Sequence, residues 1–236
     1  GEDGQEDVDV KVGRKHFDSV KIAGGISKTS QMIVLSHFKG HILFGFGGAL
    51  KNLSMGCASR AGKLAMHSKI SPWMSDGCTA CGVCVEECPA NCIDIIDGAA
   101  KINEEECIGC AHCIAVCPQG VIQVPFHGAT PQEAQERAAE YAYGAVKERK
   151  CLYMTFINNV TKDCDCLTDS KIIGDDIGII AGFDPVAMDK AAYDLVRSKN
   201  GGLDIFMKAG NPDGRRIIEN SEEIGLGNID YEIEEL

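Results

Sequence analysis

A repeat of 29 residues near the middle of the chain constrains the fold more than any other feature. The stretches CTACGVCVEECP at 78–89 and CIGCAHCIAVCP at 107–118 both have the form C-x2-C-x2-C-x3-C-P, and each cysteine of the first recurs 29 residues later in the second. Structured segments lie on both sides of the repeat. We therefore predict that it forms a module inserted over residues 74–126.

This spacing is the one that bacterial ferredoxins use to bind two 4Fe–4S clusters. Three closely spaced thiolates wrap three corners of a cubane, while the fourth lies beyond them, faces the other way and ligates the partner cluster. The expected ligand sets are Cys78, Cys81, Cys84 and Cys117 for the first cluster, and Cys107, Cys110, Cys113 and Cys88 for the second.

Two structural zinc sites are the alternative use of eight cysteines. Zinc sites usually pair two short C-x2-C hooks across a longer gap, so a single four-cysteine run ending in C-P favours the clusters. A disulfide-stapled secreted protein is a third use, but such scaffolds are usually small. We therefore expect a reducing, cytoplasmic compartment.

The repeat also accounts for some of the remaining cysteines. Cys92 aligns with Val121 at the start of a short strand after each run (CIDII and VIQV), which indicates a small buried hydrophobe beside a cluster. Cys151 opens the strand-like CLYMTFI and is interpreted in the same way. Cys57, Cys164 and Cys166 are then left without a structural explanation.

Composition limits the class of partner. With 44% apolar and 25% charged residues the chain is typical of a globular protein, and its net charge of −12 argues against nucleic-acid binding. No apolar run approaches the roughly 18 residues that span a bilayer. The expected partners are a redox protein donor or acceptor with a positive docking patch and, for an enzyme, a small-molecule substrate.

The segments around the module predict an α/β core. Strand-like runs are followed, after the module, by helices that alternate with strands. The core is expected to have an N-terminal part over 1–73 and a C-terminal part over 127–236. The expected strands are 8–12, 18–22, 31–35, 151–157 and 177–181; the expected helices begin after Thr130 with a capping box to Glu133, begin at Asp184 and Pro185 and end at Gly201, and cover 214–224.

Two glycine-rich stretches resemble nucleotide-binding loops, but neither matches the spacing and residues of the corresponding motif. In GFGGALKN, Leu50 stands where a dinucleotide-binding motif has its third glycine. In GCASRAGKL the glycines are one residue too far apart, and Leu64 replaces the magnesium-binding hydroxyl. We expect flexible loops in which Lys51, Arg60 and Lys63 are available to hold an anion.

His37 and His41 lie four residues apart, so the helical and the strand period both place them on one face. Two imidazoles on one face could bind a metal or pass protons, and a pair of partly exposed histidines at a strand end explains the spacing equally well.

Cys164 and Cys166 in NNVTKDCDC would share one face of an extended backbone, in a loop after a predicted strand. Loops at strand carboxyl ends often hold ligands in α/β proteins. The two sulfurs could bind one metal ion, and together with Cys57 they form a candidate third metal site beside the two predicted clusters. One thiol could instead react while the other resolves, and two ordinary loop cysteines are the remaining alternative.

Several blocks together resemble one family. The blocks are SHFKGHILFGFGGALKNLSMGCASRAGKLAMHS, the two cysteine repeats, NNVTKDCDC, DIGIIAGFDPVAMDKAAYDLV and EEIGLGNIDYEIEEL. From about residue 30 onward, the chain resembles the iron–sulfur members of the domain-of-unknown-function 362 family. The resemblance implies 4Fe–4S binding and a further N-terminal α/β portion that this chain lacks, so we expect a truncated product. The family blocks contain His37, His41, Lys51, Cys57, Lys63, His67, Asp163, Cys164, Cys166 and Asp184, to which the resemblance assigns no role.

Three functions fit these observations. The first is a ferredoxin-type electron carrier with the α/β core as docking scaffold. The second is an oxidoreductase with a second site near His37, His41, Cys164 and Cys166, for which Lys51, Lys63 and Asp184 are further catalytic candidates. The third is a redox- or oxygen-sensing scaffold. The many residues outside the module favour the second, because a ferredoxin needs little beyond its cluster-binding unit.

Overall fold

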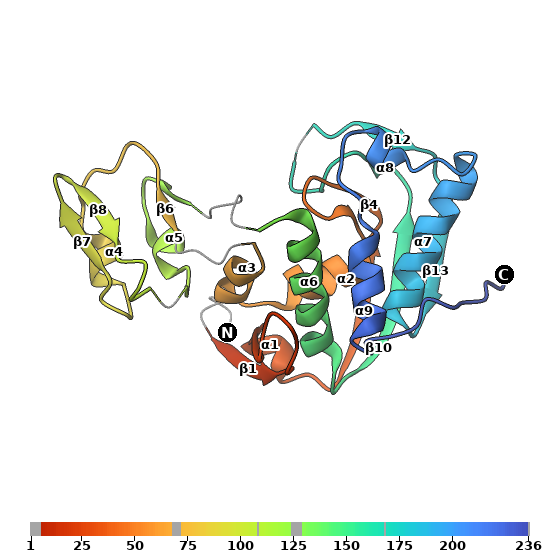
Figure 1. The fold of residues 1–236 in the computed structure, drawn as a ribbon, viewed down its shortest axis with the longest axis horizontal. Coiled ribbons are helices and arrows are strands. Elements are labelled where there is room, and N and C mark those ends of the chain that lie inside the picture. Colours follow the sequence, from red (N-terminus) through yellow and green to blue (C-terminus); the bar gives the residue numbers. More distant parts are fainter. Residues whose placement is uncertain (1–5, 68–71, 108, 124–128, 168, 236) are drawn as a thin grey trace.

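The chain folds into a mixed α/β body and a smaller lobe that carries the cysteine repeat (Figure 1). The structure is a computed structural model that describes residues 6–67, 72–107, 109–123, 129–167 and 169–235. Residues 72–123, called the cysteine-rich lobe below, lie at the left of Figure 1, and the body is built from the segments before and after them. The mixed α/β class expected from the sequence is therefore confirmed.

A three-stranded sheet forms the centre of the body, in the order β13–β10–β3. Strand β10 (Lys150–Ile157) pairs in parallel with β3 (Gln31–His37) and antiparallel with β13 (Gly178–Gly182). β-Branched, aromatic and other large apolar residues dominate β3 and β10, as strands of a packed sheet require. The expected central strands are confirmed within a few residues.

Helices α2 (Ala49–Cys57) and α7 (Pro185–Lys199) pack against this sheet. Helix α6 (Pro131–Val146) packs on α2, and α9 (Arg215–Glu223) packs on α6 and α7. Helix α6 begins with the expected capping box. The Thr130 hydroxyl accepts from the Glu133 backbone N–H at 3.2 Å, and the Glu133 carboxylate accepts from the Thr130 backbone N–H at 3.1 Å. At the start of α7 the Asp184 carboxylate accepts from the N–H groups of Val186 at 2.8 Å and Ala187 at 3.1 Å. Both helix starts were predictable because the capping residues lie next to the helices in the chain.

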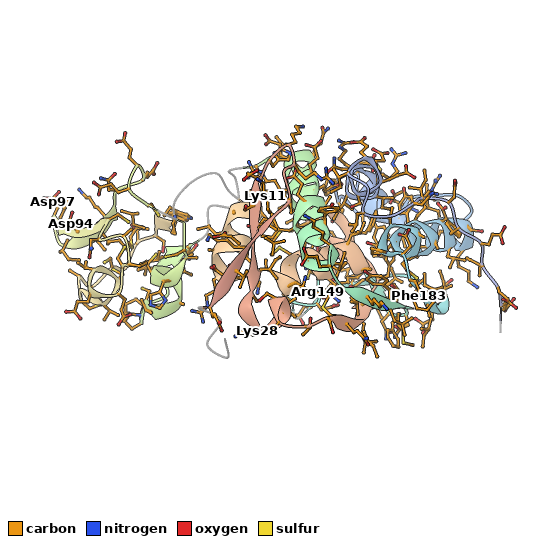
Figure 2. The ribbon with its side chains drawn as sticks, turned by 90° about the horizontal axis from the view of Figure 1, so that it is seen from below. Lys11, Lys28, Asp94, Asp97, Arg149 and Phe183 are labelled. Atoms are coloured by element: carbon orange, nitrogen blue, oxygen red, sulfur yellow. The ribbon has the colours of Figure 1, made fainter. Side chains whose placement is uncertain are left out.

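Side chains on the other face of the sheet are apolar and exposed. Ile33 and Leu35 of β3 and Ile179 of β13 are each more than half exposed, and Phe183 after β13 is 82% exposed. Figure 2 shows Phe183 on the side of the body away from Asp94 and Asp97, which lie at the outer end of the cysteine-rich lobe. The alternation of buried and exposed residues along β3 follows from covering only one face of the sheet.

The remaining elements are short. In the body they are β1 (Asp7–Lys11), β2 (Ser19–Ala23), α1 (Gly24–Ser27), β4 (Lys39–His41), β5 (Gly45–Gly47), α3 (Arg60–His67), β11 (Val160–Thr161), β12 (Ile172–Gly174) and α8 (Ile205–Lys208). In the lobe they are β6 (Trp73–Met74), α4 (Val83–Glu86), β7 (Ile93–Ile96), β8 (Ala99–Ile102), α5 (His112–Val116) and β9 (Ile122–Gln123). Val124, expected to end the strand of β9, lies outside the described residues.

The expectation of flexible glycine-rich loops before the lobe is wrong. GFG at 45–47 is strand β5, and α2 and α3 follow it. Helix α2 forms because Leu50 and Leu53 bury their side chains, and because the buried Asp189 carboxylate accepts from the Ala49 N–H at 2.6 Å and the Leu50 N–H at 3.0 Å. That cap comes from α7, so the local sequence could not show it.

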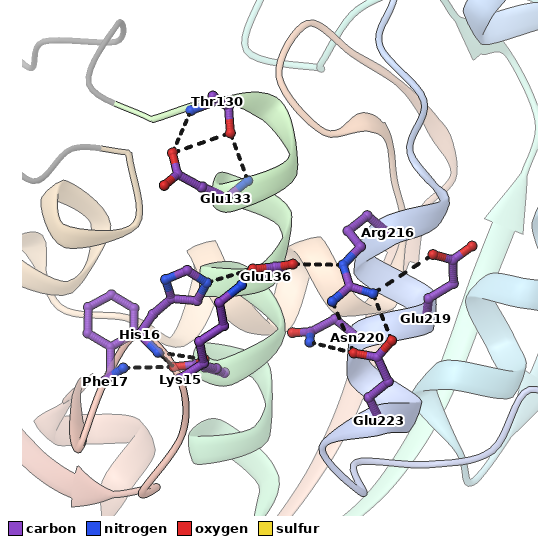
Figure 3. A network of polar contacts seen from close by, with 11 residues as sticks. Lys15, His16, Phe17, Thr130, Glu133, Glu136, Arg216, Glu219, Asn220 and Glu223 are labelled. Atoms are coloured by element: carbon purple, nitrogen blue, oxygen red, sulfur yellow. Dashed lines mark hydrogen bonds and ion pairs between the residues drawn. The ribbon is translucent and has the colours of Figure 1, made fainter.

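A buried carboxylate on α6 joins three segments of the body (Figure 3). One oxygen of Glu136 lies 2.8 Å from Lys15 Nζ and 2.7 Å from His16 Nε2, and the other lies 2.8 Å from Arg216 Nε on α9. Burial alone would raise the pKa of Glu136, but the hydrogen bonds from Lys15, His16 and Arg216 outweigh it and lower the pKa to about 2. The ionised carboxylate thus ties the loop after β1 and α9 to α6.

Replacing Glu136 by Gln should destabilise the fold in a pH-dependent way. Because the folded-state pKa is lowered from 4.5, the contribution of the carboxylate is present above about pH 4.5 and is lost as the pH falls toward about 2. We expect Glu136→Gln to lower the free energy of unfolding by roughly 1–3 kcal/mol at pH 7 and by less at pH 3 in urea titrations. The exposed Glu219→Gln, 4.0 Å from Arg216, is the matched control and should change little. An equal loss at both pH values would contradict this role of the charge.

Candidate functional site

The two halves of the cysteine-rich lobe repeat in structure as they do in sequence. Helices α4 and α5 begin at residues that are 29 apart, and so do strands β7 and β9. The backbone adopts positive φ angles at equivalent positions of both halves. These pairs are Ala80 and Gly109, Gly82 and Ala111, and Asn91 and Gly120. Such left-handed turns bend each cysteine run into a loop and are costly for alanine.

The thiols of the first expected ligand set influence one another. Cys84 is buried, and burial is the main reason why its pKa is raised; the negative charges of Cys81, Cys117 and Cys78 raise it further. Cys117 belongs to the other half of the repeat. The backbone N–H of Ala100 on β8 points at the Cys78 sulfur, at 3.4 Å.

The second expected set shows the same grouping. Burial raises the pKa of Cys113 to about 12, and the neighbouring thiols Cys110, Cys107 and Cys88 add to the shift. All four of these cysteines line one cavity, which Cys92, Ile93, Ile102 and other apolar residues also border. Cys88 comes from the first run, so each group contains one cysteine from the opposite half of the repeat.

Cys92 is buried, as predicted, and its sulfur lies 3.6 Å from that of Cys88. It extends the apolar wall of the second group together with Ile93 and Ile122. Among the described residues, no three or more His, Cys, Asp or Glu side chains are grouped to hold a metal ion. A tetrahedral zinc site would bring its sulfurs to within roughly 4 Å of one another.

A second group of polar residues lies where the parallel strands β3 and β10 end. The loop 162–171 is held by the antiparallel pair β11–β12 and by an N–H of Lys162 that donates to the Lys171 carbonyl at 2.8 Å. Within this loop the Leu167 N–H donates to the Cys164 carbonyl at 2.9 Å, which makes a turn. The extended backbone considered for DCDC is therefore wrong, although its position at a strand carboxyl end is as expected.

Asp165 connects this loop, called the thiol loop below, to the end of β3. Its carboxylate lies 2.8 Å from His37 Nδ1 and 3.0 Å from the buried Lys39 Nζ, while His37 Nε2 donates to the Asn158 carbonyl at 2.7 Å. Burial raises the pKa of Asp165, but Lys39 and His37 outweigh that effect and lower it. The loop is thus held by charge as well as by its backbone.

The two thiols of this loop differ in environment. Cys164 is buried and Lys51 Nζ of α2 lies 3.5 Å from its sulfur, whereas Cys166 is exposed. Burial raises the pKa of Cys164, but the Cys166 N–H, the charges of Lys51 and Lys39, and the Cys166 thiol lower it overall. The hydrogen bond to Cys164 is the main reason why the pKa of Cys166 is raised. The charges of Lys51 and Lys39 thus act on Cys164, the buried thiol of the pair, and lower its pKa relative to that of Cys166.

The other candidates lie elsewhere. His41 is buried, and its Nδ1 accepts from the N–H groups of Leu43 and Phe44, so it stabilises its own turn. Cys57 is buried at the end of α2, where burial raises its pKa to about 11 although the charges of Arg149 and Lys63 act to lower it. Lys63 is exposed on α3, and Asp184 caps α7 and accepts from the Asn228 N–H. The side chain of His67 lies outside the described part of the chain.

Sequence reasoning missed Lys39, which is almost fully buried beside the thiol loop. Its position between His37 and His41 in SHFKGH gave a weak signal, because lysine is almost never buried without a charged partner. The partner, Asp165, lies more than 120 residues away in the chain. The sequence placed it only on the face of an extended segment opposite Cys164 and Cys166, which does not suggest a lysine partner.

The body and lobe therefore define a mixed α/β protein with a repeated cysteine lobe and a separate thiol loop. Residues 1–194 match the family model described as Domain of unknown function (DUF362), and the chain belongs to this family. The match includes the first 30 residues, which the sequence resemblance had left out, and ends within α7. No curated protein and no solved structure matches the chain. In the part that the structure describes, no helix combines the length and apolar character needed to cross a membrane.

Replacing Gly40 by Ala should damage the thiol loop. A Cβ at Gly40 would come within 2.6 Å of the Lys162 carbonyl carbon and 2.7 Å of Asn211 Nδ2, which donates to the Lys162 carbonyl oxygen. We expect a loss of roughly 1–3 kcal/mol in the free energy of unfolding, measured by urea titration, because backbone must move. Gly25→Ala, where a Cβ meets nothing within 4 Å, is the control. A Gly40→Ala variant as stable as this control would show that the close approach is not needed.

Proposed function

We propose that the protein holds two 4Fe–4S clusters in the cysteine-rich lobe and transfers single electrons. The observation that carries the proposal is the cavity that Cys107, Cys110, Cys113 and Cys88 line, three cysteines from one run and one from the other. This is the ligand assignment that the ferredoxin spacing requires. It also supports a ferredoxin-like fold for the lobe.

The residues of the lobe fit a cubane cluster. In such a cluster each thiolate binds a different iron, so the sulfurs surround a volume instead of converging on one ion. Cys88, Cys107, Cys110 and Cys113 border one small cavity. When bound, the clusters would supply one-electron transfer.

The lobe itself would tune that transfer. The cysteines pack against buried apolar residues such as Ile93, Ala100 and Ile122, which limit the access of water to the sulfurs. The Ala100 N–H donates to the Cys78 sulfur, and hydrogen bonds to sulfur are one determinant of cluster potential. The protein's contribution is therefore burial and backbone polarity around the thiolates.

Charge on the lobe suits a basic redox partner. Its only lysine is Lys101, against the acidic residues Asp76, Glu86, Glu87, Asp94, Asp97, Glu104, Glu105 and Glu106. Glu104, Glu105 and Glu106 are exposed beside the second cysteine run. A surface of one sign steers an oppositely charged partner toward it, so we propose an electron donor or acceptor with a positive docking patch.

A second candidate function is an oxidoreductase whose substrate site is the thiol loop. The specific observation is that Lys39, Lys51, Cys164 and Asp165 meet at the carboxyl ends of β3 and β10, where α/β proteins commonly bind ligands. A plain electron carrier does not need such a group. On this proposal the protein is part of a redox enzyme, and the lobe exchanges electrons with its partner.

The test is anaerobic iron and acid-labile sulfide analysis of the purified protein, with EPR spectroscopy after reduction. The proposal predicts eight irons and eight sulfides per chain, four of each per cluster, and two interacting paramagnetic centres. Stoichiometric zinc in place of iron would reject the clusters and support the zinc alternative.

Single-cysteine variants test the ligand sets. Cys88→Ala should disrupt the cluster held by Cys107, Cys110 and Cys113, although Cys88 lies in the other run; Cys117→Ala should disrupt the cluster held by Cys78, Cys81 and Cys84. Cys151→Ala, a half-buried cysteine of β10, is the matched control and should keep all eight irons. Loss of the cluster within the mutated run, seen by EPR, would contradict the crossed assignment.

A further inference from the structure

We propose that Cys164 and Cys166 form a dithiol–disulfide pair that reduces disulfide substrates, with Cys166 meeting the substrate and Cys164 resolving the mixed disulfide. This inference deepens the second candidate function by naming the reaction of its site. It does not depend on the clusters, because every group that it uses belongs to the body. In Figure 1 the lobe lies on one side of α6, whereas β4 and β12, which adjoin the thiol loop, lie on the other.

The order of the two roles follows from exposure. Cys166 is exposed and Cys164 is almost fully buried, so a disulfide arriving from solvent reaches the Cys166 sulfur first. Access is one of the factors that decide which sulfur takes part in thiol–disulfide exchange. Cys164 lies behind it, in the same turn.

The turn brings the two residues within disulfide range. The hydrogen bond from the Leu167 N–H to the Cys164 carbonyl closes a four-residue turn, in which the first and last Cα atoms lie within roughly 7 Å. Cys164 and Cys166 are closer in sequence than those two ends, and a disulfide needs Cα atoms roughly 4–7 Å apart.

Charged groups from several elements stabilise a thiolate on Cys164. Lys51 of α2 contacts the sulfur at 3.5 Å, and Lys39 of β4 adds its charge from within the body. Asp165 is neutralised by Lys39 and His37, and Asp163 is turned into the loop, where its N–H and carboxylate contact Ser170. An electropositive, partly accessible setting of this kind is typical of reactive cysteines.

The reaction balances without a further reagent. As the Cys166 sulfur attacks a disulfide RSSR′, its proton passes to Cys164, a Cys166–SR bond forms and R′S⁻ leaves. The leaving thiolate takes the proton from Cys164 and becomes R′SH. The Cys164 thiolate then attacks the Cys166 sulfur, expels RS⁻ and forms the Cys164–Cys166 disulfide. Two electrons pass from the dithiol to the substrate, and Lys51 stabilises the thiolate of Cys164 before each of the two attacks.

The test uses the neutral aromatic disulfide 2,2′-dithiodipyridine on anaerobically purified protein with its metal content measured first. The wild type should release two thiopyridone molecules in a fast phase and carry a Cys164–Cys166 disulfide, seen by peptide mass spectrometry. Cys164→Ser should release one thiopyridone, more slowly, and keep the adduct on Cys166, and Cys166→Ser should lose the phase. Cys151→Ser is the control that should leave the phase unchanged.

The effect of Lys51 on the rate and pH midpoint of the fast phase tests its role in stabilising the Cys164 thiolate, because a residue with only a structural role would change neither. Lys51→Met should slow the fast phase about 3- to 10-fold near neutral pH and move its pH midpoint upward, whereas the exposed Lys28→Met should do neither. Two stable adducts in the wild type without a disulfide would overturn the proposal, as would a metal ion that is lost in Cys164→Ser. Iron content reports on the clusters separately, so failure of either proposal is recognised independently.

Discussion

The parallel pairing of β3 with β10 is the constraint on which the rest of the structure depends. Parallel neighbours need a crossover connection, and here the chain between them contains α2, α3, the cysteine-rich lobe and α6. The crossover returns the chain so that both strands end at the same edge of the sheet. His37 and Asp165 therefore meet although they are separated by 128 positions in the chain. The thiol loop is thus a product of topology.

Buried charge holds that edge in place. Lys39 is almost fully buried, and burying an ammonium group is costly unless it is paired, which Asp165 and the His37 carbonyl achieve at 3.0 and 2.9 Å. Asp189 is also buried and accepts from the first N–H groups of α2, and burial raises its pKa to about 7. Because Lys51 stands on the first turn of α2, this cap also fixes the position of the ammonium group that contacts Cys164.

Local signals explain which parts of the fold could be predicted. The starts of α6 and α7 were visible because Thr130, Glu133 and Asp184 lie next to the helices they cap, and the central strands were visible as short apolar runs. Helix α2 was missed because its cap, Asp189, belongs to a distant helix and its glycines suggested a loop. The pairing of Lys39 with Asp165 was missed for the same reason.

The two candidate sites also differ in how far local sequence predicts them. A repeat with fixed spacing carries its own ligand assignment, so the two cysteine sets could be predicted from the sequence alone. In the thiol loop the two cysteines and Lys51 could be named as candidates from the sequence, but nothing local could distinguish the roles of the two thiols. That difference comes from α2 and β4, which bury Cys164 beside two ammonium groups and leave Cys166 exposed.

On the two proposals, the lobe would carry one-electron transfer and the thiol loop two-electron thiol exchange, in different parts of one chain. The central claim is that each cluster is held by cysteines from both runs of the repeat. Anomalous diffraction at the iron edge, from crystals of anaerobically purified protein, tests it directly. The account predicts two iron clusters, one beside Cys78, Cys81, Cys84 and Cys117 and one beside Cys107, Cys110, Cys113 and Cys88. Iron bound by all four cysteines of a single run, or a lobe that holds only single metal ions, would contradict it.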